Sequence, residues 1–124
     1  MEQPIILLYN LRNIKGKKIE KLSSRLKITA KYVEASGYLE PIGFLAEIPD
    51  IAETGQVLNG VPFMDEMLVM SGFSDDLLNT FLKEFKKQHI EPVALKAIIT
   101  SQNKTWDSFM LNKELNRERE AFKK

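Results

Sequence analysis

Four short apolar runs divide the chain. Residues 5–9 and 67–70 are apolar at nearly every position, which is typical of strands that are buried on both faces. Residues 28–33 and 93–99 hold β-branched side chains and predict two further strands. These runs alternate with segments of a different periodicity, so the pattern predicts a domain of both strands and helices.

The segments between and after these runs place apolar residues at helical spacing. They are residues 14–26, residues 39–48, a segment that Ser74 opens and a closing segment that begins at Trp106. Gly16 lies in the first turn of the first helix and is expected to weaken it by up to ~1 kcal/mol relative to alanine. Residues 49–65 contain two prolines and two glycines and predict an irregular link.

The two halves of the chain resemble each other. Residues 4–48 and 66–122 each read as strand, helix, strand and helix, and several pairs of identical residues share one offset: Lys31 and Lys96, Ser36 and Ser101, and Phe44 and Phe109. We therefore predict one domain made of two pseudo-repeats of a β-α-β-α unit. A single unit would leave one face of its sheet bare, and two units close the domain.

The fold expected from this pattern is α+β, with a four-stranded ferredoxin-like sheet and one extra helix after each β-α-β unit. Because residues 5–9 and 67–70 are apolar on both sides, the sheet needs helices on both faces. The helix at residues 39–48 and the one from Trp106 supply the second cover. A small doubly wound α/β sheet is the alternative, and it follows if the long link works as a crossover instead of a reversal.

Length and composition narrow the protein's class. The chain has 124 residues, enough for one domain with a sizeable core. It contains no cysteine, which excludes disulfides, thiolate catalysis and cysteine-ligated metals. No apolar run approaches the roughly 20 residues of a membrane helix, and the first residues do not have the pattern of a signal peptide. The expected location is the cytoplasm.

Charge is segregated along the chain. Residues 12–31 hold eight basic residues and one acid, whereas residues 32–66 hold seven acids and no lysine or arginine. The two segments either pair with each other or leave a basic face for an anion. A candidate anion site lies where four cations meet a helix N-terminus, and its residues are Arg12, Lys15, Lys17 and Lys18.

Metal and catalytic sites find little support in the sequence. His89 is the single histidine, and Asp75 and Asp76 follow a serine where acids commonly open a helix, so neither predicts a metal ligand. Lys96 and Thr100 share a strand face, but they lie about 13 Å apart along it, too far for direct activation. We expect no catalytic residue, no metal and no cofactor.

A second candidate site surrounds the polar loop before the last helix. Trp106 could close a small ligand pocket whose other residues are Lys96, Thr100 and Asn103. We favour the structural interpretation, in which Asn103 caps the last helix and Trp106 packs that helix against the domain.

Three motifs carry a family resemblance. They are Met67-Leu-Val-Met-Ser-Gly-Phe-Ser74, Leu95-Lys-Ala-Ile-Ile-Thr100 and Asn103-Lys-Thr-Trp106. With them the chain resembles a small, uncharacterised bacterial family, a domain of unknown function, and residues 38–45 resemble the region that precedes this domain in longer members. The resemblance implies a bacterial cytoplasmic protein and brings no known activity, ligand or catalytic residue.

Two functional hypotheses follow. The preferred one is a non-catalytic interaction or regulatory module, which binds a second copy or another protein through its C-terminal helix, where Phe122 extends the apolar stripe of Leu111 and Leu115. The alternative is a binder of an anionic small molecule or nucleic acid through residues 12–31. Nucleic acid is the weaker of these ligands, because the strands offer only Tyr9 and Tyr32 as aromatic residues.

Overall fold

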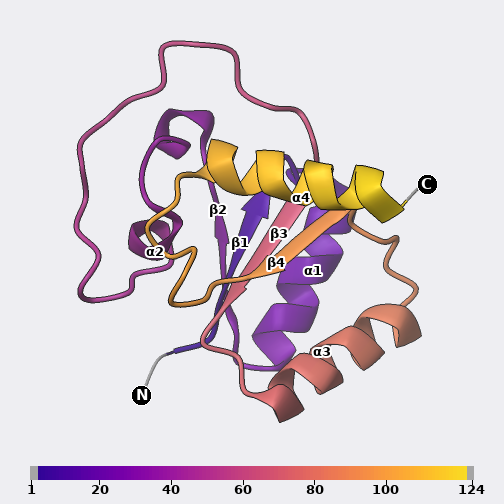
Figure 1. Ribbon diagram of the computed structural model, residues 1–124. Coiled ribbons are helices and arrows are strands. Elements are labelled where there is room, and N and C mark those ends of the chain that lie inside the picture. Colours follow the sequence, from indigo (N-terminus) through magenta and orange to yellow (C-terminus); the bar gives the residue numbers. More distant parts are fainter. Residues whose placement is uncertain (1–2, 123–124) are drawn as a thin grey trace.

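A computed structural model describes residues 3–122, which form an α+β fold around one mixed sheet (Figure 1). The strands are β1 (Ile5–Tyr9), β2 (Thr29–Tyr32), β3 (Met67–Ser71) and β4 (Leu95–Ile98). The α-helices are α1 (Ile14–Arg25), α2 (Ile42–Leu45), α3 (Asp75–Lys87) and α4 (Ser108–Phe122), and a short 3₁₀ helix, η1, spans Ala35–Gly37. The expected fold class is confirmed.

The sheet has the order β2-β1-β3-β4. Strands β1 and β2 are parallel, β3 and β4 are parallel, and the central pair β1 and β3 is antiparallel. In a ferredoxin-like sheet another strand separates the two strands of a β-α-β unit. Here the two strands of each unit are neighbours, so the ferredoxin-like arrangement is not confirmed. The antiparallel central pair also makes the doubly wound parallel alternative wrong.

The positions of the strands follow from their composition. Every residue of β1 and β3 is buried, and these two strands occupy the centre of the sheet. Strands β2 and β4 each carry a lysine and lie at the edges, where one side of the strand can meet water. Burial of the most apolar strands therefore accounts for the pairing of the two halves through β1 and β3.

Both faces of the sheet are covered, each by a core of its own. The core beneath α1 and α3 contains Ile6, Leu8, Leu68 and Met70 from the central strands (Figure 1). The opposite core takes the alternate strand residues and packs them against α2, α4 and the aromatic side chains near them. None of the helices in residues 3–122 has the length and apolar character needed to cross a lipid bilayer.

Main-chain hydrogen bonds join α2 to the loop before α4. The Ile42 N–H donates to the Trp106 carbonyl over 2.7 Å, and the Gly43 N–H donates to the Lys104 carbonyl over 2.8 Å. A Cβ atom at Gly43 would lie 2.6 Å from that Lys104 oxygen, so this approach requires glycine. The helix expected at residues 39–48 is shorter, Ile42–Leu45, because Pro41 before it is extended (φ −58°, ψ 137°) and Glu47 after it takes a positive φ of 63°.

Residues 46–66 contain no helix or strand, and contacts at several points hold them to the domain. Glu40, only 5% exposed, accepts hydrogen bonds from the Thr54 N–H at 2.7 Å and from the Gly55 N–H at 2.8 Å. At the other end, the ring of Phe63 stacks on Tyr38 with their centroids 4.5 Å apart. The division of the chain into two pseudo-repeats around this link stays a prediction.

Candidate binding groove between α3 and β4

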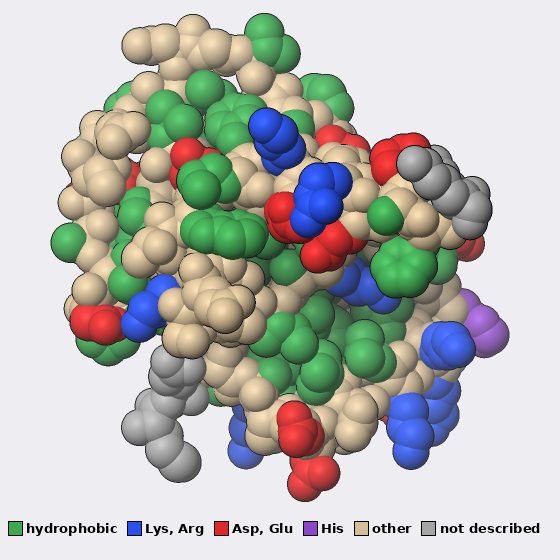
Figure 2. Space-filling view, in the orientation of Figure 1, with side chains coloured by type: hydrophobic (Ala, Val, Ile, Leu, Met, Phe, Trp, Pro, Cys, Tyr) green, Lys and Arg blue, Asp and Glu red, His purple; other side chains and the backbone are tan. Residues whose placement is uncertain are grey.

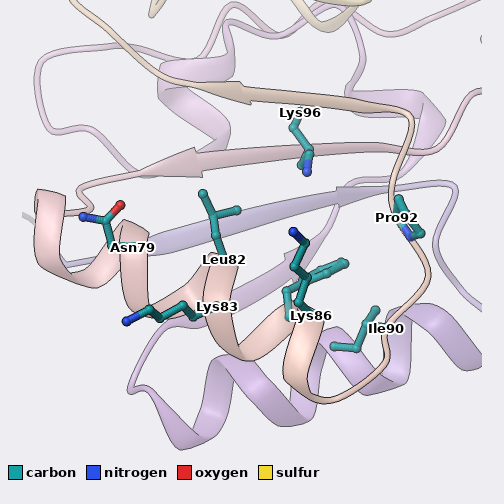
Figure 3. Close-up of a pocket in the computed structure, with 8 residues that line it drawn as sticks. Asn79, Leu82, Lys83, Lys86, Ile90, Pro92 and Lys96 are labelled. Atoms are coloured by element: carbon teal, nitrogen blue, oxygen red, sulfur yellow. The ribbon is translucent and has the colours of Figure 1, made fainter.

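A hollow between α3 and β4 has a volume of about 640 Å³. That size falls within the range of small-ligand sites. Figure 2 shows hydrophobic side chains gathered in this hollow, below α4. We call it the α3–β4 groove, and its lining residues are Asn79, Leu82, Lys83, Phe85, Lys86, Ile90, Pro92 and Lys96 (Figure 3).

Helix α3 supplies one wall of the groove through a single face. Asn79, Leu82, Lys83 and Lys86 are spaced at i, i+3, i+4 and i+7, so they project from the same side of the helix. The helix itself is well capped, because the Ser74 hydroxyl accepts a hydrogen bond from the Leu77 N–H at 3.1 Å. The wall is therefore held by an element whose sequence strongly favours a helix.

Strand β4 supplies the other wall through Lys96. Successive side chains of a strand point to opposite faces, and Leu95 and Ala97 belong to the core beneath α4. Lys96 and Ile98 therefore project to the α3 side of the sheet. Ile98 is 43% exposed there, although isoleucine is usually buried.

The opposite edge of the sheet shows why this groove is open. In β2 the residues that face the α1 side of the sheet are Ala30 and Tyr32, which pair with Ile6 and Leu8 of β1. The Tyr32 hydroxyl donates a hydrogen bond to Glu20 of α1 at 2.6 Å, so its ring bridges strand and helix. Burial and this hydrogen bond raise the pKa of Tyr32 to about 12.

In the second half, Lys96 and Ile98 stand at these positions beside Leu68 and Met70 of β3. Neither residue is an aromatic that could bridge to α3 as Tyr32 bridges to α1. The same architecture is therefore closed at one edge and open at the other.

The lysines of the groove have no acidic partner. Within residues 3–122, no hydrogen bond or ion pair involves the ammonium groups of Lys83, Lys86 or Lys96. Figure 3 shows Lys86 and Lys96 pointing toward each other across the groove, beside Leu82. Two like charges that face each other repel, and an anion between them would turn that repulsion into attraction.

The predicted pocket around Trp106 is not brought together. Lys96 faces α3, whereas Trp106 packs against the core on the other side of the sheet. Thr100 and Asn103 close a turn: the Thr100 N–H donates to the Asn103 side-chain oxygen at 2.8 Å. The predicted helix cap is also wrong, because Asp107 accepts the hydrogen bond from the Met110 N–H, and α4 begins at Ser108.

The four residues of the predicted anion site do not share one anion site, because two of them pair with different acids of the chain. Arg12 forms an ion pair with Glu34, and the Lys15 ammonium lies 2.5 Å from a carboxylate oxygen of Glu66. Lys17 and Lys18 are exposed along α1. Two of the four cations therefore pair with the acidic segment that follows them in the sequence, as one of the two readings of the charge pattern expected.

Most groove residues were not predicted from the sequence, because α3 was expected only to pack on the core. A signal was present in the spacing of Asn79, Leu82, Lys83 and Lys86, since a core-facing stripe does not carry two lysines. No group of three or more histidine, aspartate or glutamate side chains in residues 3–122 is placed to hold a metal ion.

Comparison with known proteins places this groove within one family match. The family described as Domain of unknown function (DUF3783) matches residues 66–122, which span β3, α3, β4 and α4 and include the whole groove. The expected resemblance to a domain of unknown function is thus confirmed for this segment. Neither the comparison with curated proteins nor that with solved structures gave a match.

Proposed function

We propose that the chain, whose second half matches that domain of unknown function, is a non-catalytic interaction module that binds an anionic partner in the α3–β4 groove. One observation carries this proposal: Lys86 and Lys96 face each other across an apolar floor without an acid between them. The lysines supply attraction and orientation for an anion, and the apolar floor supplies affinity through burial.

The chemistry of the lining supports a role without catalysis. The groove offers amines, one amide and apolar side chains, which bind and orient a partner. The hydroxyl nearest to Lys96 in sequence, on Thr100, accepts hydrogen bonds from the main chain of Gln102 and Asn103 within its own turn. A nucleophile needs a base within hydrogen-bond reach, and this hydroxyl serves the loop instead.

The C-terminal helix is a second proposed contact surface. Phe122 is 91% exposed at the end of α4, whereas Leu111 in the same helix is 2% exposed. A large apolar side chain gains most from burial, so this position favours contact with a second copy or another protein.

The alternative function is binding of an anionic small molecule or nucleic acid through residues 12–31. Its support is the exposed basic face of α1, which carries Lys17, Lys18 and Lys21. The ion pairs of Arg12 and Lys15 with acids of the same chain weaken it, because those cations already have partners. Salt-sensitive retention on heparin that Lys17→Ala and Lys18→Ala abolish would favour this alternative over the groove.

We also propose that the chain is a tandem of two related β-α-β-α units. The ends of α1 and α3 support this, because Lys27 and His89 both take positive φ angles, 61° and 57°. Each is followed by a buried isoleucine, Ile28 or Ile90. Each isoleucine N–H donates back into its helix, Ile28 to Ser23 and Ile90 to Phe85, so α1 and α3 end in the same way, as repeats of one unit would.

A cytoplasmic location belongs to this proposal. Its support is that the chain contains no cysteine and so lacks the disulfides common in small secreted domains. Fractionation of cells that produce the full chain tests it, and recovery of the protein in a membrane or secreted fraction would contradict it.

The groove proposal is tested with 8-anilinonaphthalene-1-sulfonate, an aromatic anion that becomes fluorescent in apolar sites. We expect saturable binding that the charge reversals Lys86→Glu and Lys96→Glu together weaken at least about tenfold. Lys113→Glu, at an exposed lysine of α4, is the matched control and should leave binding unchanged. Equal weakening by the control, or binding that ignores the groove lysines, would overturn the proposal.

A further inference from the structure

The β4 strand forms one wall of the groove and is also an edge of the sheet. The described strands end at β4, so its outer side has no strand neighbour. An unpaired edge presents main-chain N–H and C=O groups that another extended segment can use. The groove therefore lies beside a place where the sheet can be extended.

The hydrogen bonds of β4 show which groups face outward. The Ile99 N–H, just past the strand, donates to the Met70 carbonyl of β3 at 2.9 Å. Because main-chain groups alternate between the two sides of a strand, Lys96 and Ile98 direct theirs away from β3. The Ile98 carbonyl accepts a hydrogen bond from the Asn103 side chain at 3.1 Å. Within residues 3–122, the N–H and C=O of Lys96 and the N–H of Ile98 have no hydrogen-bond partner.

Lys96 provides both the main-chain N–H and C=O at the open edge and a positive charge in the groove. Lys96 directs its ammonium into the groove beside Lys86 and its N–H and C=O to the open edge. In an antiparallel pair, two opposing residues exchange both N–H···O=C bonds and place their side chains on the same face. A residue opposite Lys96 would therefore send its side chain toward the two lysines.

We propose that the partner is a short extended peptide segment that pairs antiparallel with β4 and places a glutamate or aspartate opposite Lys96, between that residue and Lys86. Residues two positions along the segment, about 7 Å away, face the groove as well and are apolar, so that they cover the exposed side chains of Leu82 and Ile98. This proposal rests on the proposed function and specifies its partner.

Two observations favour such a segment and this edge. At the β2 edge the matching face is occupied by Tyr32, whose hydroxyl donates a hydrogen bond to Glu20 of α1. The chain's own C-terminal end is a poor occupant, because Lys123 and Lys124 follow Phe122 and would bring more cations to the lysines. An acidic segment of a partner protein has the complementary charge.

The experiment uses a fluorescein-labelled, acetylated peptide, Ser-Leu-Thr-Glu-Thr-Leu-Ser, whose leucines and glutamate share one face when extended. Fluorescence anisotropy with the full chain should show saturable binding. Methylation of the glutamate N–H removes the bond to the Lys96 carbonyl and should weaken binding at least about tenfold. A second peptide with lysine in place of glutamate should bind poorly to the native chain and recover on the variant with both Lys86→Glu and Lys96→Glu.

The outcomes separate the two proposals. Equal binding of the methylated peptide would overturn strand pairing, and failure of the charge-swapped pair would overturn the acid opposite Lys96. Absence of peptide binding while 8-anilinonaphthalene-1-sulfonate still binds through the lysines would overturn this inference and leave the groove function standing. Loss of both signals in the native chain would overturn both. Unchanged thermal unfolding of the double variant shows that it is folded.

Discussion

Among single residues, Glu40 has the most demanding environment. Its buried carboxylate accepts hydrogen bonds from the N–H and hydroxyl of Thr54 and from the N–H of Gly55. These bonds, above all the one from the Thr54 N–H, hold the pKa of Glu40 below its usual range. The ionised form is therefore favoured by the folded state, and it fastens the link of residues 46–66 to the domain.

Replacing Glu40 with glutamine should lower the melting temperature near neutral pH. Because the folded pKa is depressed, the carboxylate stabilises the fold above its usual pKa of about 4.3, and this contribution disappears as the pH falls through the folded pKa. Thermal unfolding followed by circular dichroism should thus show a gap between native chain and variant that closes on acidification. The exposed Glu53→Gln is the control, and a gap that stays constant with pH would contradict the assignment.

Gly16 shows how a local rule can mislead about one residue. Helix propensity alone predicts that alanine at this position stabilises α1. In the fold, a Cβ atom there would lie 1.6 Å from the Leu11 carbonyl oxygen, which no side-chain motion can relieve. The close approach of main chain to main chain therefore requires glycine.

We expect Gly16→Ala to lower the free energy of unfolding by roughly 1–3 kcal/mol, in the range of overpacked sites. Gly37→Ala is the matched control, since its Cβ would meet only the Leu45 side chain at 3.7 Å, an ordinary contact. Urea unfolding measures both variants. A Gly16→Ala chain at least as stable as the native one would show that α1 can move away from Leu11.

At the scale of elements, the central strands place neighbouring residues in different cores. Leu68 lies in the core beneath α1 and α3, and Val69 lies in the core beneath α2 and α4. Each is fully buried. We expect Leu68→Ala and Val69→Ala each to cost on the order of 2–4 kcal/mol in chemical denaturation, because each leaves a cavity in a different core.

Val61 provides the control for this pair, since it is 87% exposed in the link. Val61→Ala should change the free energy of unfolding by less than about 0.5 kcal/mol, as at most surface sites. A cost of that small size at Leu68 or Val69 would mean that one face of the sheet is not packed.

The elements themselves were largely predictable because their signals are local. The apolar runs at residues 5–9 and 67–70 mark the central strands, and the capping residue Ser74 marks the start of α3. The strand order was not predictable, because pairing of β1 with β3 joins segments far apart in sequence and no local pattern records its direction. The apolar periodicity of residues 39–48 likewise does not show that Pro41 is extended and that Glu47 takes a positive φ, which limit the helix to Ile42–Leu45.

The candidate site was predictable only in one residue. The sequence predicted Lys96 as a site residue, but with Thr100, Asn103 and Trp106 from the loop that follows it. Closeness in sequence does not tell which face of the sheet a strand residue points to. Its neighbours in the fold come from α3, and they share the α3–β4 groove because β3 and β4 are adjacent. Knowledge of the strand order would have placed Lys96 opposite Lys86 and Leu82.

At the scale of the whole molecule, part of the segregated charge forms ion pairs within the chain. The acidic segment supplies partners to the basic one, Glu34 to Arg12 and Glu66 to Lys15, and it reaches α4 through Asp65, which lies 4.0 Å from Arg119. The lysines of the α3–β4 groove stand outside these pairs. A nearly neutral chain thus has unpaired lysines beside an open apolar surface, which is where the proposed anion would bind.

The C-terminal end of α4 is the surface through which we propose that the molecule associates with itself. Phe122 is 91% exposed, so Phe122→Ser should change the monomer's free energy of unfolding by less than about 0.5 kcal/mol. If two copies meet through this helix, the same change should weaken self-association in sedimentation velocity, because the buried aromatic area of the interface is lost. Val57→Ser, at an exposed apolar residue of the link, removes hydrophobic surface elsewhere and should leave association unchanged. A loss of several kcal/mol from the monomer would place Phe122 in the core, and association that both variants leave intact would exclude a dimer built on this helix.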